Sequence, residues 1–210
     1  MKIPNCCALL IVALLAPIIQ CSAMAADKQP RVTAIEKISQ LFVVGTTTVP
    51  GVGKIEVAFS PKGGAEELII KSIDSAQSEI KMLAYAFTSS RITEALIKAV
   101  RRGVKISLAA DEDHNLSRSG ESNKGRSALS ALATAGVSVR VVSAFAIHHD
   151  KLIVVDEKHV QSGSFNYTAS AQNRNSEYVM VNWNNPELAR VMLTHFNRNF
   201  SLGKQYSPSY

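Results

Sequence analysis

Apolar residues from Ile55 onward follow two alternating periodicities, and this alternation is the strongest constraint on the fold. Short apolar runs predict strands, and longer runs with one apolar face predict helices between them. The pattern predicts strand, helix, strand, helix, strand, helix and strand at residues 55–59, 65–76, 80–87, 91–102, 104–110, 127–135 and 137–142. Such an order predicts an α/β layered sandwich with a central mixed, mainly parallel sheet flanked by helices.

The last third of the chain changes this rhythm. It predicts a hairpin within residues 152–161, a strand over 177–183 and a final helix that opens at Pro186 and ends near Phe200. The polar stretch 111–125 is expected to be a loop.

The first 26 residues differ from the rest of the chain. One cation precedes an apolar run over residues 8–19 and the small-residue sequence Ala23-Met24-Ala25-Ala26. These are the three parts of a secretory signal peptide, with cleavage expected near Ala25 or Ala26. The alternative is a membrane anchor, but the run of about 12 residues is shorter than the roughly 20 that a spanning helix needs. The mature protein is therefore expected to be periplasmic or secreted.

The remaining chain divides into two expected parts. Residues 27–54 include Pro50, Gly51 and Gly53, which predict an N-terminal extension or linker. Residues 55–210 are expected to form one domain, because a chain of 210 residues is too short for two comfortable cores.

Cysteine and charge restrict the possible chemistry. All three cysteines, Cys6, Cys7 and Cys21, lie inside the expected signal, so the mature chain would have no disulfide, thiolate metal site or cysteine nucleophile. Removing residues 1–25 removes Lys2 and no acid, which changes the formal net charge from +6 to +5. A modest positive excess suits an anionic substrate, although many exported proteins carry as much for solubility.

Residues 149–166 contain the pattern H-x-K-x4-D-x6-G-S-x-N. On a strand, His149 and Lys151 would share one face. Together they suit a phosphate, because the ammonium neutralises its oxygens while the imidazole attacks phosphorus or moves protons. Ser164 and Asn166, in a glycine-containing turn, would complete an anion cradle. Each residue alone has an ordinary structural explanation, but six identities at fixed spacing favour a functional site.

This pattern resembles the HKD motif of the phospholipase D superfamily, and the resemblance extends over about residues 55–210. The other matching segments are Phe59-Ser60-Pro61, Met82-Leu83-Ala84-Tyr85-Ala86-Phe87-Thr88, Arg102-Gly103-Val104 and Asn175-Ser176-Glu177. The resemblance implies a two-step hydrolysis in which His149 attacks a phosphodiester and forms a phosphohistidine. A second histidine protonates the leaving oxygen and then activates water.

The resemblance also assigns roles to the other motif residues. Lys151, Ser164 and Asn166 would hold the phosphate, and Glu177 would orient an imidazole. Asp156 belongs to the motif, but a carboxylate repels a phosphate, so it is expected to orient other groups. No metal or other cofactor is implied. Because the chemistry needs two motif histidines and the chain has one motif, a homodimer is implied, with both copies of the nucleophile at the two-fold interface.

The resulting hypothesis is an exported, metal-independent endonuclease of low sequence specificity that hydrolyses DNA, with RNA as a further substrate to test. Arg118, Lys124 and Arg126 would contact the nucleic-acid backbone, with a solvated charged face as the alternative. The sequence shows no ordered aromatic platform for reading bases.

Two other functions remain open. A lipid phosphodiesterase of the phospholipase D type is disfavoured by the small size, the single motif and the absence of an obvious interfacial helix. A non-catalytic nucleic-acid-binding module is disfavoured because every motif residue is present.

The polar segment 111–115 is the strongest candidate for a metal site in the sequence. Its D-x-D-x-N pattern begins like a calcium loop, but Leu116 stands where glycine is needed and Ser122 where glutamate is needed. The segment is instead expected at the carboxyl edge of the sheet, where such folds bind substrates. His148 is expected to face away from His149 because neighbouring strand residues point to opposite sides.

Overall fold

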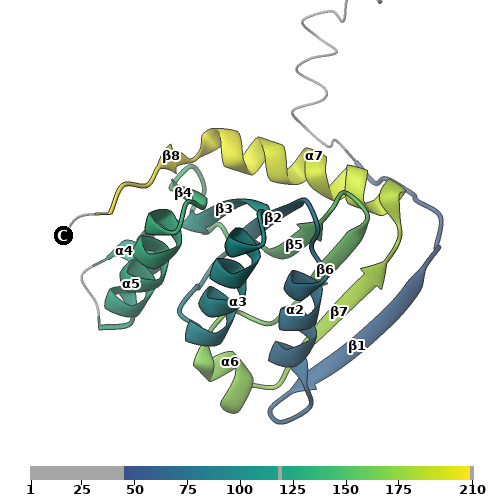
Figure 1. Cartoon of the computed structure of the whole chain (residues 1–210), viewed down its shortest axis with the longest axis horizontal. Helices are drawn as coiled ribbons and strands as arrows, with labels where there is room; N and C mark the ends of the chain where they lie inside the picture. Colours follow the sequence, from purple (N-terminus) through teal and green to yellow (C-terminus); the bar gives the residue numbers. More distant parts are fainter. Residues whose placement is uncertain (1–44, 118–119, 209–210) are drawn as a thin grey trace, which may run out of the picture. The chain divides into compact units, whose positions relative to one another are not determined.

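The computed structural model describes residues 45–117 and 120–208 (Figure 1). The expected signal peptide, residues 27–44 of the expected extension, and Arg118 lie outside the described residues.

In the described part of the chain, eight strands form one sheet in the order β1-β7-β6-β5-β2-β3-β4-β8 (Figure 1). The strands are β1 (Lys54–Ser60), β2 (Glu79–Ala84), β3 (Lys105–Asp111), β4 (Ser138–Val142), β5 (Lys151–Val155), β6 (His159–Gly163), β7 (Glu177–Trp183) and β8 (Lys204–Gln205). The helices are α2 (Ala65–Asp74), α3 (Ser90–Arg101), α4 (Glu112–Leu116), α5 (Gly120–Thr134), α6 (Ala169–Asn173) and α7 (Pro186–Leu202).

The predicted α/β fold with a mixed sheet is confirmed, but the parallel part of the sheet is small. Among the described strands, only the neighbours β2, β3 and β4 pair in parallel. The other five pairings are antiparallel. The chain returns after β4 to place β5 beside β2 in the opposite direction, and β6 then follows β5 through a tight turn, which only antiparallel strands permit.

Both faces of the central strands are buried. Ile80 and Met82 of β2 pack in the core under α2, α3 and α5, whereas Leu83 belongs to a second core with Ala189 and Phe196 of α7. Figure 1 shows α2, α3 and α5 side by side and α7 running along the sheet. Burial on both faces explains why these strands appear in the sequence as continuous apolar runs.

The expectation of a loop over residues 111–125 was wrong, because α4 and the first turns of α5 occupy it. Asp111 caps α4 by accepting a hydrogen bond from the backbone N–H of His114 at 2.8 Å. Gly125 allows α5 to approach α4, since a Cβ at this position would lie 3.0 Å from the carbonyl oxygen of Asn115. Capping and close packing therefore outweigh the low helix propensity of this polar segment.

The predicted hairpin is confirmed as β5 and β6, with Val155 paired to His159. Asp156 and Glu157 in the turn have φ angles of 49° and 54°, as a type I′ turn requires. Lys158 closes the turn through its N–H, which donates to the carbonyl of Val155 at 3.1 Å.

Asp156 lies at this turn, roughly 16 Å along β5 from Lys151. Its carboxylate accepts hydrogen bonds of 2.7–3.0 Å from the N–H groups of Gln77, Ser78 and Glu79 and from the Ser78 hydroxyl. Burial alone would raise the pKa of Asp156, but these hydrogen bonds outweigh it and hold the pKa at about 2. The motif aspartate therefore ties the hairpin to the start of β2, away from the other motif residues.

We expect Asp156→Asn to lower the free energy of unfolding at pH 7 by on the order of 1–2 kcal/mol, because a charged acceptor is lost. Partial solvent exposure keeps this below what the pKa shift alone implies. Since the folded pKa lies below the ordinary value of 3.8, wild type has this advantage above pH 4 and loses it as the pH falls towards 2. Urea denaturation should show the difference shrinking across that window.

The exposed carboxylate of Asp74 offers a matched control, because its contact with Arg102 is long at 3.8 Å. Asp74→Asn should change stability little at either pH. If the difference in unfolding free energy between Asp156→Asn and wild type stayed the same from pH 7 to pH 3, the charge of Asp156 would not be its cause.

Candidate active site

The β5–β6 hairpin brings the two halves of the motif together. His149 lies two residues before β5, Ser164 immediately follows β6, and Leu152 pairs with Ser162 between them. A cavity of about 480 Å³ lies at this end of the hairpin. It is lined by His149, Asp150, Lys151, Leu152, Ser162, Gly163, Ser164, Tyr178, Met192 and His195.

Lys151 is the buried cation of this cavity. The residue is 9% exposed, and its ammonium donates to the backbone carbonyl of His149 at 2.8 Å. Burial lowers the pKa of Lys151, while the carboxylates of Asp150 and Glu177 oppose that shift. A cation with little water around it acts more strongly on a bound anion than a solvated one.

Ser164 is held in place by Glu177. The Ser164 hydroxyl donates to the Glu177 carboxylate at 2.5 Å and accepts from the N–H of Tyr178 at 3.2 Å. Asn175 donates to the other carboxylate oxygen at 3.0 Å. Within the described chain Glu177 therefore positions Ser164, whereas the sequence had suggested an imidazole as its partner.

Gly163 is required by the packing next to Ser164. A Cβ at Gly163 would lie 2.3 Å from the carbonyl oxygen of Tyr178, and its φ of 156° is unusual for other residues. The glycine of the motif thus lets β6 end against the backbone of β7.

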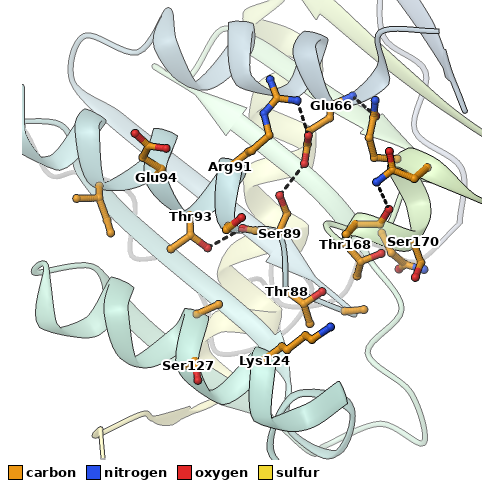
Figure 2. Close-up of a pocket in the computed structure, with 18 of the residues that line it drawn as sticks. Glu66, Thr88, Ser89, Arg91, Thr93, Glu94, Lys124, Ser127, Thr168 and Ser170 are labelled. Carbon is orange, nitrogen blue, oxygen red and sulfur yellow. Dashed lines mark hydrogen bonds and ion pairs between the residues drawn. The ribbon is translucent and has the colours of Figure 1, made fainter. Parts of the chain in front are cut away.

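Asn166 lies on the other side of this turn, where it lines a larger cavity of about 1150 Å³ (Figure 2). Its amide oxygen is buried and has no hydrogen-bond donor among the residues that the structure describes. A buried polar atom without a partner is unfavourable, so this amide oxygen needs a donor that the described residues do not supply.

Tyr85 is a site residue that the sequence patterns did not single out. Its ring centroid lies 4.6 Å from that of His149, and the Lys151 ammonium lies 5.2 Å from the same ring. The backbone of Tyr85 is held by two hydrogen bonds. Its N–H donates to the carbonyl of Asp150 at 3.0 Å, and its carbonyl accepts from the side-chain amide of Asn115 at 2.6 Å. Tyr85 therefore touches both the expected nucleophile and the expected phosphate-binding cation.

Asp150 and His195 form a second pair that sequence reasoning missed. The His195 ring on α7 lies 3.1 Å from the Asp150 carboxylate, and the buried His148 ring lies 3.5 Å from its other oxygen. Burial would raise the pKa of Asp150, but the hydrogen bond from His195 and the neighbouring positive groups hold it below its ordinary value. The pair connects α7 to the segment that carries His149. The only sequence signal was the place of Asp150 inside the motif.

His148 is not among the residues that line the smaller cavity, and neither it nor His149 lies on a strand, so the alternation expected for them does not apply. His148 is 2% exposed, and burial lowers its pKa. His149 is exposed to solvent.

The basic residues expected to contact a ligand separate in the structure. Lys124 extends from α5 into the larger cavity, whereas Arg126 donates to the carbonyl of Leu116 and supports the α4–α5 connection. Lys124 is therefore the one of the three that the described structure places at a cavity.

The polar segment 111–115 has structural roles. Asp111 caps α4 and also accepts from the N–H of His148 at 2.9 Å. The fully buried Asn115 bonds to the backbone of Tyr85 and Phe87. Among residues 45–117 and 120–208, no group of three or more His, Cys, Asp or Glu side chains is placed to hold a metal ion. No helix in the same residues is long and apolar enough to span a membrane.

Comparison with known proteins points to one family. Residues 69–200 match the model of the family described as cardiolipin synthase, PLD-like domain. A phospholipase D of Rickettsia conorii is 38% identical over 128 residues, which cover 61% of this chain and 60% of that protein. A mitochondrial cardiolipin hydrolase of Danio rerio is 30% identical over 129 residues, covering 61% of this chain and 53% of that protein. The chain thus spans about three fifths or less of these relatives.

Two solved structures share the fold. Nuc from Salmonella typhimurium, a phospholipase D family member, has a TM-score of 0.69 and 39% identity, covering 73% of this chain and 97% of that one. NucT from Helicobacter pylori has a TM-score of 0.62 over 73% of this chain and 99% of that one. At 19% identity it supports the fold alone.

We expect Tyr85→Leu to lower kcat on an activated phosphodiester such as bis(p-nitrophenyl) phosphate by on the order of 10- to 100-fold, because two site side chains lose their shared support. Tyr85→Phe keeps the ring and should retain most of the activity. Circular dichroism and thermal denaturation would establish that both variants fold. Equal activity of the Leu and Phe variants would show that the ring does not position the site.

Proposed function

The chain belongs to the phospholipase D superfamily, and on that premise we propose that it is a metal-independent phosphodiesterase that hydrolyses nucleic acid. We further propose that it is an exported protein, processed near Ala25 or Ala26, and that it acts in the periplasm or outside the cell.

One observation carries the proposal: His149, Lys151 and Ser164 line one cavity although they come from two strand ends. The imidazole of His149 is exposed to a ligand, the ammonium of Lys151 is buried beside it, and Glu177 holds the Ser164 hydroxyl. A nucleophile next to a fixed cation and a fixed hydroxyl suits attack on a phosphodiester.

In the proposed reaction His149 attacks phosphorus, and a P–N bond forms as the bond from phosphorus to the leaving oxygen breaks. A second imidazole gives its proton to that oxygen. The same group then takes a proton from water, which attacks the phosphohistidine and releases His149. Lys151 would neutralise the charge that develops on the phosphate oxygens.

Nucleic acid is the favoured substrate because the Salmonella typhimurium Nuc combines 39% identity with a match over 97% of its chain. The larger cavity beside Asn166 is lined mainly by hydroxyl, amide and charged side chains, which suit a sugar-phosphate chain better than an acyl chain. Cleavage of DNA, and of RNA as a further substrate, is therefore proposed.

A lipid phosphodiesterase is the second candidate, and one surface feature favours it. Ile55, Val57 and Phe59 alternate along the edge strand β1 and are 53%, 51% and 60% exposed. Phe59 pairs with Tyr178, which is 48% exposed and lines the smaller cavity. An apolar strip that reaches the site could contact a lipid surface, and relatives named phospholipase D and cardiolipin hydrolase also fit this reading.

A substrate panel in EDTA separates the two candidates. Protein lacking residues 1–26 should cleave plasmid DNA and single-stranded DNA in chelator and leave phosphatidylcholine and cardiolipin vesicles intact, because histidine and lysine supply the chemistry. RNA tests the breadth of the substrate range. His149→Asn should bind DNA and fold normally but cleave nothing.

Other outcomes of the panel are equally informative. Loss of all cleavage in chelator, with recovery in magnesium, would contradict the mechanism. Hydrolysis of vesicles without cleavage of DNA would establish the second candidate. Substantial turnover by His149→Asn would mean that another residue is the nucleophile.

We also propose that the active protein is a homodimer whose two His149 side chains meet at the two-fold axis, because the two-step reaction needs two histidines. Co-refolding equal amounts of wild type and His149→Asn then leaves about a quarter of the all-wild-type activity, since only dimers with two intact chains work. Independent subunits would retain about half. Activity near half, or a monomer by sedimentation, would direct attention to His195, which lines the same cavity.

A further inference from the structure

The larger cavity, of about 1150 Å³, is enclosed by α3, α5 and the segment around α6 (Figure 2). Figure 2 shows Lys124 of α5 directed toward Thr88, with Arg91 and Glu94 on α3 and Thr168 and Ser170 before and within α6. Hydroxyl and amide groups make up most of its polar lining. They belong to Thr88, Ser89, Ser90, Thr93, Asn123, Ser127, Asn166, Thr168, Ser170, Gln172, Asn173 and Asn175.

This cavity is next to the proposed catalytic cavity. Asn166 lines the larger one and stands two residues from Ser164, which lines the smaller one. Tyr85 is a second link between the cavities. Its ring centroid lies 4.6 Å from that of His149, which lines the smaller cavity, and 4.3 Å from that of His114, which lines the larger one. A ligand with its reacting phosphate at His149 would reach the larger cavity by passing Tyr85.

The charges of the larger cavity favour an anion. Its acidic residues already have partners: Glu66, which is 4% exposed, accepts from Ser89 at 2.6 Å and from Arg91 at 2.7 Å. Glu94 pairs with Lys98 at 2.8 Å in the same way.

Two lining cations remain. Among the residues whose side chains the structure describes, Arg101 and Lys124 have no carboxylate within 4 Å. Both side chains are exposed, so they are free to approach the phosphates of a ligand.

Resting on the proposed function, we infer that this cavity binds the part of a single-stranded polynucleotide next to the scissile phosphate. Lys124 and Arg101 contact its backbone phosphates, and the hydroxyl and amide groups contact its sugars and phosphates. The His114 ring, supported by Tyr85, provides an aromatic face for an unpaired base. A base inside a duplex is already stacked and is not free to use that face, so the site favours single strands.

The test compares Lys124→Ala with Lys105→Ala, which removes an exposed cation at the start of β3, the opposite end of that strand from α4. Binding of a labelled single-stranded oligodeoxynucleotide is measured by fluorescence anisotropy across a salt series, in the His149→Asn background. Lys124→Ala should weaken binding several-fold and reduce the salt slope by about one unit. The Lys105→Ala control should match the parent protein.

Kinetic measurements on protein that retains His149 show whether the loss caused by Lys124→Ala arises in the larger cavity. The fold-loss in kcat/KM caused by Lys124→Ala should be larger on the oligonucleotide than on bis(p-nitrophenyl) phosphate, which is too small to extend into the larger cavity. His114→Leu should weaken binding of a normal oligonucleotide more than binding of one with abasic sites, and His114→Phe should restore much of the difference.

An unchanged salt slope for Lys124→Ala, or equal losses on the long and small substrates, would overturn the inference. So would tighter binding of a duplex than of its separated strands. If the wild-type protein cleaves no diester at all, the proposed function fails, but the anisotropy series still decides whether this cavity binds a polynucleotide.

Discussion

Antiparallel pairing of β5 with β6 joins Leu152–Val155 to residues 159–162, and the carboxylate of Asp156 anchors the turn between them. The register of this pairing decides which residues meet at the open end of the hairpin. A slip by one position would move Lys151 to the other face of the sheet and separate it from Ser164. The site thus depends on the pairing of β5 with β6 and on a turn that lies a full strand length away from it.

Burial then gives the site its electrostatic character. Lys151 is almost removed from solvent, yet it keeps a backbone carbonyl and the face of Tyr85 as partners. Asp150, the next residue, is held by His195 and so is turned towards α7. Neighbouring residues of one short segment therefore contact different parts of the protein: Lys151 contacts the ring of Tyr85, which follows β2, and Asp150 contacts His195 of α7.

Several features were predictable because they follow from local pattern. Strand and helix periodicities located most elements, including β7 at the expected bounds Glu177–Trp183, since both depend on residues close in the chain. The loop expected over 111–125 was wrong because the cap of Asp111 and the contact of Gly125 with Asn115 stabilise helices that propensity alone disfavours. Strand order was also hidden, since no local pattern shows that β5 inserts beside β2.

The sequence by itself determined the family, the motif and the kind of chemistry, because six residue types at fixed spacing carry that information along the chain. Only the tertiary structure decided that Asp156 supports the fold, that Glu177 holds Ser164, and that Tyr85 touches His149. These contacts join residues that are between 13 and 78 positions apart in the sequence. They arise when strands pair and helices cover them, and no spacing within a single segment records that event.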